Sequence, residues 1–402
     1  MSARVVKPVG RGFLFLDSHP AGCARVVRDM AAEVAGPTGG EPAERRTALV
    51  IGSSSGYGLA TTIAGLARYG IDGVGVCFEK AATARRTATA GWYRTAETAA
   101  LAAELGRSWS FVNADAFADT TKDEVLDLVA AKLGRIDHLI YSVAAPRRTD
   151  PRTGETYQSV LKAIGSPHST KSLAFEDGEP VLQEAVPIEV ANDDEIAQTV
   201  KVMGGEDWTR WVAALQERDL LNSGFNTVAL TYIGSELTGP LYRQGSIGAA
   251  KADLEQTALK LAADGVTAMT SVNGAAVTQA SSAIPGIGLY VSLLHNVLGA
   301  ADVAPDWQTP IEQSAALWGQ LTGAVPLDLD EAGRIRLDRW ELAHEVQEAV
   351  RASWQSATRD NLTKLADTDW FFAEVRRLYG FDVQDVDYDA ETEVDVAWPT
   401  GV

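Results

Sequence analysis

A glycine-rich segment between an apolar strand and a helix constrains the fold of this chain more than any other feature. Residues 47–70 read TALVIGSSSGYGLATTIAGLARYG, where a buried strand over Ala48–Ile51 leads into Gly52, Gly56 and Gly58. Glycines let such a turn reverse sharply and let backbone N–H groups approach a phosphate. The helix that follows offers the positive end of its dipole. A plain tight turn is the alternative, but the strand–turn–helix context favours dinucleotide binding.

Strands and helices alternate around this unit. Strands are predicted within 72–80, 109–117 and 135–146, with helices between them, and the alternation returns over 226–277. Alternation of this kind is typical of βαβ units and a parallel sheet. We therefore predict an α/β fold with a Rossmann-type, doubly wound parallel sheet, similar to that of short-chain dehydrogenases. Extra elements include an N-terminal strand over Arg11–Leu16.

The predicted organisation is one elaborated catalytic domain over residues 1–380. Its parts are a cofactor half (about 45–146), an insertion beside the ligand cleft (about 147–207), a catalytic and substrate-binding half (about 208–330) and C-terminal helices (about 331–380). Residues 381–402 carry seven acids and no base, and we interpret them as an added acidic tail.

The balance of charges excludes two classes of partner. The 402 residues carry 35 Lys and Arg against 54 Asp and Glu, a net charge of −19. Nucleic acids and anionic membranes both attract basic surfaces, so we expect neither as a partner. The chain lacks a signal peptide and any apolar run of roughly 18 residues, which predicts a cytoplasmic protein. Cys23 and Cys77 have no metal-site spacing, and we predict no metal.

Polar and small residues recur where the predicted strands end, at the edge that binds ligands in open α/β sheets. Glu79 ends the second strand 21 residues after Gly58, where an acid can accept hydrogen bonds from the adenosine ribose. A carboxylate there repels a 2′-phosphate and so favours NADH over NADPH. The basic residues Lys80, Arg85 and Arg86 lie nearby and are able to bind a 2′-phosphate, which is the alternative. Asp115 ends the third strand and is a candidate contact of the adenine ring. Ser142–Ala145 end the fourth strand, where small residues leave room for the nicotinamide half. Close packing at a strand end explains both sets of residues equally well.

A tyrosine and a lysine are the candidate reacting pair. None of the ten tyrosines has a lysine four residues later, which is the spacing in ordinary short-chain dehydrogenases. Tyr242 instead has Lys251 nine residues later, with the lysine in the first turns of a long predicted helix. A neighbouring ammonium stabilises a phenolate and so makes tyrosine a usable proton donor. A surface tyrosine and a solvated lysine are the alternative that spacing alone leaves open.

Several segments together resemble one family, the monomeric NADH-dependent enoyl reductases. These are the FabV-type enoyl-acyl carrier protein reductases and the trans-2-enoyl-CoA reductases. The resemblance extends from about Val6 to Phe381 and includes the Tyr-x8-Lys pair that distinguishes the family. The segments are HPAGC (19–23), IGSSSGYGLA (51–60), CFEK (77–80), TAGWY (89–93), VKVMGGEDW (200–208), YIGSELTGPLYRQGSIGAAK (232–251) and AVTQASSAIP (276–285).

The resemblance implies a role for each matching residue. Tyr242 is implied as proton donor, Lys251 as the residue that holds the cofactor ribose, and Tyr232 as a contact of the substrate carbonyl. The implied NAD contacts are Gly52, Ser53, Ser54, Ser55, Gly56, Tyr57, Phe78, Glu79, Asp115, Ala116, Val143, Ala144, Lys251, Ala276, Val277 and Thr278. One departure is visible, because SVNGAAVTQ (271–279) lacks a lysine expected just before this last group.

The implied reaction reduces the C2=C3 double bond of trans-2-enoyl thioesters with NADH in fatty acid biosynthesis. The substrate is an enoyl-CoA or an enoyl-acyl carrier protein, and the enzyme is expected to be a monomer. Residues 283–298 are the best candidate wall for the acyl chain, although a plain core helix fits them equally. Arg147, Arg148 and Arg152 are either contacts for the carrier or solvated. A short-chain-type ketoreductase and a non-catalytic dinucleotide-binding regulator are the alternative functions.

Overall fold

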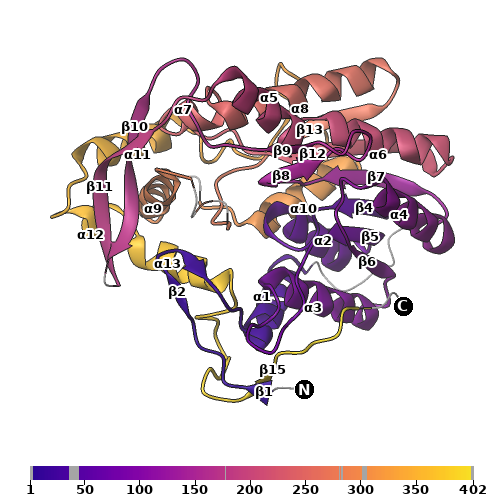
Figure 1. The fold of residues 1–402 in the computed structure, drawn as a ribbon, viewed down its shortest axis with the longest axis horizontal. Helices are drawn as coiled ribbons and strands as arrows, with labels where there is room; N and C mark the ends of the chain where they lie inside the picture. Colours follow the sequence, from indigo (N-terminus) through magenta and orange to yellow (C-terminus); the bar gives the residue numbers. More distant parts are fainter. Residues whose placement is uncertain are drawn as a thin grey trace.

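A computed structural model describes residues 3–35, 45–176, 178–279, 281, 284–300 and 306–399. Its centre is a seven-stranded sheet in which every pair of neighbouring strands is parallel, which confirms the predicted fold class (Figure 1). The strands, in spatial order, are β14 (Ile335–Arg336), β13 (Thr267–Val272), β12 (Leu221–Thr231), β7 (Ile136–Tyr141), β4 (Thr47–Ile51), β5 (Asp72–Cys77) and β6 (Trp109–Asn113).

Helices cover both faces of this sheet because side chains alternate along each strand. In β4, Ala48 and Val50 pack against one group of helices, and Leu49 and Ile51 pack against the other. The first group contains α1 (Pro20–Val34), α2 (Gly56–Tyr69), α3 (Ala90–Glu104) and α10 (Pro310–Leu321). The second contains α4 (Asp119–Lys132), α6 (Glu206–Glu217) and α8 (Ser246–Ala263).

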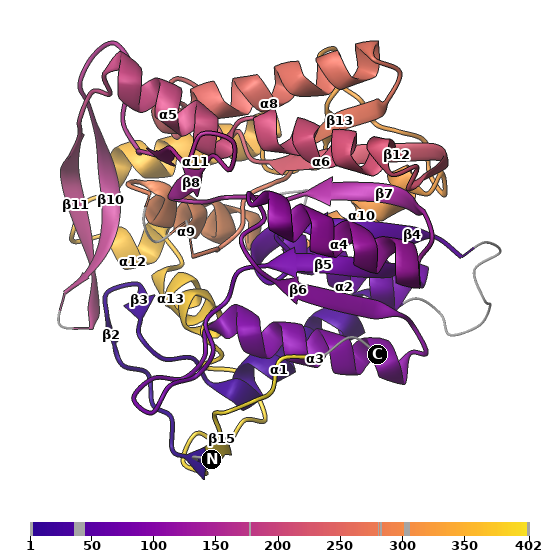
Figure 2. The same cartoon turned by 45° about the vertical axis from the view of Figure 1, so that its right-hand side comes forward.

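Residues 147–207 form two hairpins and a helix. The short hairpin is β8 (Arg147–Thr149) with β9 (Thr156–Gln158), and the long one is β10 (His168–Glu176) with β11 (Glu179–Ile188). The long hairpin lies beside α9 (Ile287–Leu298) and α12 (Leu362–Leu365) (Figures 1 and 2). Helix α5 (Asp193–Met203) then packs on α8.

The C-terminal helices complete a second core around α9. Helices α11 (His344–Ser356) and α13 (Thr368–Arg377) supply buried Val346, Val350 and Phe371 to it. Helix α7 (Gly239–Tyr242) supplies Tyr242 to the same core. None of the helices that the structure describes is both long and apolar enough to span a membrane.

Two predictions at the chain ends were wrong. Arg11–Leu16 is not one strand but part of a hairpin of β2 (Gly10–Arg11) and β3 (Leu14–Phe15), which turns where Gly12 has a positive φ of 58°. The segment from residue 381 is not an appended tail: β15 (Thr392–Glu393) pairs with β1 (Ala3–Arg4), and Val394 is buried. The acids of this segment are exposed, whereas the apolar Phe381, Val383 and Val394 are buried against the domain.

Candidate active site

The turn after β4 has the geometry of a phosphate cradle. Gly52 has a φ of 90°, and a Cβ added there would lie 1.9 Å from the carbonyl oxygen of Ser142. A Cβ on Gly58 would lie 2.0 Å from the oxygen of Gly52. Side chains are therefore excluded at both positions, and the N-terminus of α2 opens directly at the turn. This observation makes the residues fit a dinucleotide.

The end of β5 presents an oriented carboxylate. Glu79 accepts a hydrogen bond from the Ser54 hydroxyl at 2.6 Å and another from the Thr89 hydroxyl. Its backbone N–H donates to Asn113 Oδ1 at 2.7 Å. The adjacent Phe78 is 76% exposed, which leaves an aromatic face available for stacking with a base. A carboxylate held in this position suits the ribose hydroxyls predicted for it.

The remaining predicted NAD contacts lie at the same edge of the sheet. Asp115 and Ala116 follow β6, Val143 and Ala144 follow β7, and the segment 276–278 comes after β13. Thr278 faces the cradle, because a Cβ on Gly56 would lie 3.8 Å from Thr278 Cγ2. The structure thus gathers segments that are more than 200 residues apart in the sequence.

Three residues form the candidate reacting centre. Tyr232, just after β12, meets Tyr242 edge to face, with ring centroids 4.9 Å apart. Lys251 on α8 places Nζ 5.6 Å from the Tyr242 ring centroid and donates to Thr231 Oγ1 at 3.3 Å. The predicted pair therefore does come together, with Tyr232 as its third member.

The pKa of Tyr242 is not lowered, as an ammonium that stabilises the phenolate would lower it. Burial raises the pKa of the Tyr242 hydroxyl above its ordinary value of 10, and the Glu341 carboxylate adds to this rise. Burial also lowers the pKa of Lys251 from 10.5 to about 8, and the nearby Arg243 guanidinium acts in the same direction. Tyr242 therefore stays protonated at neutral pH and is available as a proton donor.

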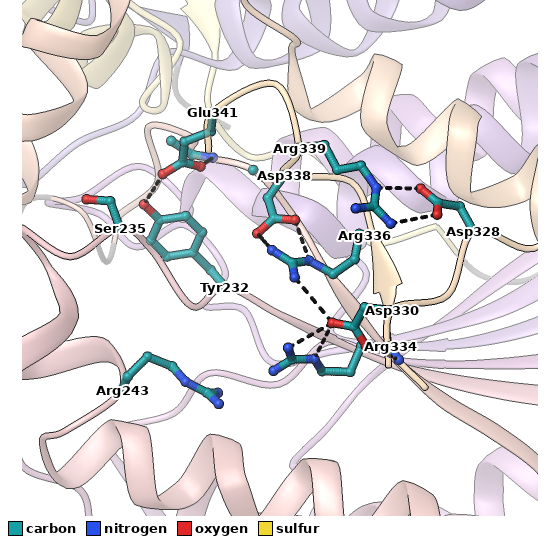
Figure 3. Close-up of polar contacts among 12 residues, drawn as sticks. Tyr232, Ser235, Arg243, Asp328, Asp330, Arg334, Arg336, Asp338, Arg339 and Glu341 are labelled. Atoms are coloured by element: carbon teal, nitrogen blue, oxygen red, sulfur yellow. Dashed lines mark hydrogen bonds and ion pairs between the residues drawn. The ribbon is translucent and has the colours of Figure 1, made fainter. Parts of the chain in front are cut away.

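Sequence reasoning missed Glu341 and Tyr290. The Tyr232 hydroxyl donates to Glu341 Oε1 at 2.8 Å (Figure 3), and the Tyr290 hydroxyl donates to the same oxygen at 2.7 Å. Tyr57, predicted as a cofactor contact, donates to the carbonyl oxygen of Gly274 at 2.6 Å and so joins the cradle to the segment after β13. No local pattern marks Glu341, which lies 99 residues after Tyr242.

A pocket opens beside Tyr242, between the insertion and the catalytic half. Its lining is largely apolar, as an acyl chain requires. The lining residues are His168, Thr170, Ile188, Leu237, Thr238, Pro240, Leu241, Tyr242, Pro285 and Gly286. Most of the wall predicted over 283–298 is instead a core helix: α9 is buried along most of its length, and only Pro285 and Gly286 of this range line the pocket. Ala283 lies outside the described residues.

The arginines after β7 largely serve the fold. Arg148 is 1% exposed, donates to the carbonyl oxygen of Lys201 at 2.8 Å and lies 3.6 Å from Glu206. Arg152 pairs with Asp150 at 3.3 Å and also with Glu206. Arg147 and Arg152 are both exposed, and of the three only Arg147 forms no ion pair within the described ranges. Burial therefore makes Arg148 unavailable to a carrier, whereas Arg147 and Arg152 reach the surface.

Comparison with known proteins identifies the family. The model described as the catalytic region of trans-2-enoyl-CoA reductase matches residues 86–321, and the model for the NAD(P)H-binding domain of that enzyme matches residues 5–84. The chain belongs to the trans-2-enoyl-CoA reductase family. An enoyl-[acyl-carrier-protein] reductase [NADH] of Streptomyces avermitilis is 61% identical over 98% of this chain and 100% of its own length.

Other members of the family agree in sequence and in structure. A trans-2-enoyl-CoA reductase [NADH] of Clostridium perfringens is 41% identical over 97% of this chain and 99% of its own length. The crystal structure of Treponema denticola trans-2-enoyl-CoA reductase in complex with NAD has a TM-score of 0.89 and 38% identity, covering 97% of this chain and 98% of that one.

A third family model, described as an enoyl reductase FAD-binding domain, matches residues 329–392. Its range includes residues 381–392 of the predicted acidic tail. The range contains only two glycines, Gly333 and Gly380, and neither lies between strand β14 and helix α11. A Cβ on Gly380 would lie 2.6 Å from the backbone of Cys23, so that glycine serves helix packing. These residues do not form a dinucleotide cradle, and no catalytic step is assigned to FAD.

Proposed function

We propose that this chain reduces the C2=C3 double bond of trans-2-enoyl thioesters with NADH, with Tyr242 as proton donor. The arrangement that carries the proposal is Tyr232, Tyr242 and Lys251 beside an apolar pocket. Tyr57 joins this centre to the cradle through the segment after β13. Phosphate binding, substrate binding and proton donation are thus combined at one edge of the sheet.

The residues have separable tasks in this mechanism. NADH, when bound, supplies the hydride for C3. Negative charge then develops on the thioester oxygen, where a tyrosine hydroxyl stabilises it in the manner of an oxyanion hole. Tyr232 holds that oxygen, and Tyr242 delivers the proton to C2. Lys251 binds the cofactor ribose and so fixes the cofactor relative to Tyr242.

The finer assignments are part of the same proposal. We expect Gly52–Tyr57 to hold the pyrophosphate, Glu79 the adenosine ribose, and Ala276–Thr278 the nicotinamide half. We also propose that the protein works as a cytoplasmic monomer in fatty acid biosynthesis. The carrier is coenzyme A or acyl carrier protein; of the three arginines suggested for it, Arg148 is buried beside Glu206, and Arg152 pairs with Asp150 and Glu206 at the surface.

Steady-state kinetics test the proposal. Purified protein is given NADH with crotonyl-CoA, with longer enoyl-CoA thioesters, and with the same acyl groups on acyl carrier protein. We expect NADH oxidation with formation of the saturated thioester, and kcat/KM across the carriers identifies the preferred one. Oxidation with a 3-ketoacyl thioester but with no enoyl thioester would instead support a ketoreductase. NADH binding without turnover of either would support a regulator.

A further inference from the structure

Glu341 is a fully buried carboxyl group beside the reacting centre. It is 0% exposed. Its Oε1 accepts hydrogen bonds from Tyr232 and Tyr290, and its Oε2 accepts one from the backbone N–H of Ala275 at 2.6 Å. Ala275 directly precedes the segment predicted to close over the nicotinamide. The carboxyl group thus joins a substrate-binding tyrosine to the cofactor side of the site.

A network of ion pairs holds the segment that carries Glu341 (Figure 3). Asp328 binds Arg339 through both carboxylate oxygens, at 2.7 and 2.8 Å, and Asp338 binds Arg336 in the same way, at 2.7 Å for each contact. Asp330 accepts from Arg336 at 3.2 Å and also pairs with Arg334. Paired arginine–carboxylate contacts have a defined geometry, so the network fixes the position of residue 341.

The hydrogen bond from Tyr232 to Glu341 matters because Tyr232 has only one hydroxyl proton to donate. While Glu341 is ionised, that proton is donated to the carboxylate and is not available to a substrate. Once Glu341 is protonated, the carboxyl group can donate to the tyrosine oxygen, and the Tyr232 proton can turn to the thioester oxygen. We propose that Glu341 is a positioning residue whose protonation releases the Tyr232 hydroxyl for the substrate oxygen; this role rests on the proposed function.

The surroundings of Glu341 favour a proton on it near neutral pH. Burial raises its pKa from 4.5 to about 7, and the Asp338 carboxylate acts in the same direction. The two tyrosine hydroxyls and the N–H of Ala275 oppose this rise by donating to the carboxylate. Gln347 on α11 donates to the Tyr290 hydroxyl at 3.0 Å. The other titratable groups that feel the Glu341 charge are Tyr57 on α2 and Tyr242 on α7.

The pH dependence of kcat/KM tests the role of Glu341. In the parent, the value is expected to fall about tenfold between about pH 6 and pH 8, because one group near pH 7 loses its proton. Glu341→Gln keeps the size of the side chain but cannot ionise, and its fall over the same range should be below about threefold. A uniform loss of activity at every pH would indicate a merely structural residue and would overturn the proposal.

A second variant keeps the test decisive if Glu341→Gln does not fold. Tyr290→Phe removes one hydroxyl donor to the carboxylate, destabilises the ionised form and should move the fall in kcat/KM to higher pH. An unmoved profile would overturn the proposal. Failure of the parent to reduce any enoyl thioester would overturn the proposed function itself, whereas turnover with unchanged profiles in both variants would overturn only the role of Glu341.

Discussion

Lys251→Met separates the catalytic need for a buried ammonium from its cost to the fold. The Lys251 side chain is partly buried, contacts Thr231 and the Tyr242 ring, and forms no ion pair with any residue that the structure describes. Methionine keeps much of the length of the side chain and removes the charge. We expect the variant to lose most of its turnover and yet to gain stability at neutral pH.

The size of the gain follows from the pKa. A change from 10.5 in the unfolded chain to about 8 in the fold corresponds to about 3 kcal/mol. Because the side chain is partly exposed, solvent screening reduces this value to roughly 1.5 kcal/mol. Between pH 8 and 10.5 the unfolded chain keeps the proton that the fold has lost. The contribution of Lys251 to the free energy of unfolding of the parent therefore rises with pH over this window, and the variant lacks this contribution.

Urea unfolding of the cofactor-free protein, followed by tryptophan fluorescence, measures this difference. The advantage of Lys251→Met over the parent should shrink by roughly 1.5 kcal/mol between pH 7.5 and 10.5, because other groups titrate alike in both proteins. Lys260→Met, at an exposed position on the same helix, is the matched control and should show a constant difference. A difference for Lys251→Met that does not change with pH would refute the reasoning.

Three further substitutions test the cradle and the donor. Tyr242→Phe should retain NADH affinity, measured by fluorescence titration, and lose at least about a hundredfold in kcat with crotonyl-CoA; near-parental turnover would reassign the donor. Glu79→Ala should raise kcat/KM with NADPH relative to NADH, because the carboxylate no longer repels a 2′-phosphate; an unchanged ratio would remove that role. Gly52→Ala should abolish NADH binding and lower the thermal midpoint, because its Cβ meets the Ser142 oxygen. Gly134→Ala, also at positive φ but with no atom near its Cβ, is the control for backbone strain alone.

The fold class could be predicted because it depends on patterns among residues that are close together in the sequence. Alternating apolar strands and helices require a covered parallel sheet, and the glycines after Ile51 admit one geometry of turn. The sequence likewise placed Lys251 in the first turns of a long helix and Tyr242 in the segment that leads into it, and the structure has them on α8 and at the end of α7. The same reasoning failed for residues 381–402, since counting acids did not reveal the apolar residues between them that pack inward.

Long-range packing decided the rest of the site. From the sequence, the arginines after β7 could be solvated or could bind a carrier; in the fold Glu206 pairs with Arg148 and Arg152, and only Arg148 is buried. The effect on the Tyr242 pKa was likewise opposite to the expected one, because burial and the Glu341 carboxylate raise it, while the Lys251 ammonium lies 5.6 Å from the ring centroid.

The sequence by itself determined that this chain would form a dinucleotide-binding parallel sheet with a tyrosine and a lysine at its ligand edge. Only the tertiary structure decided which carboxyl group faces Tyr232. Glu341 reaches it from a segment that follows the last strand of the sheet and is held by arginine–aspartate pairs. No periodicity in the sequence predicts such a contact, because it forms only when elements far apart in the chain pack together and bury both side chains.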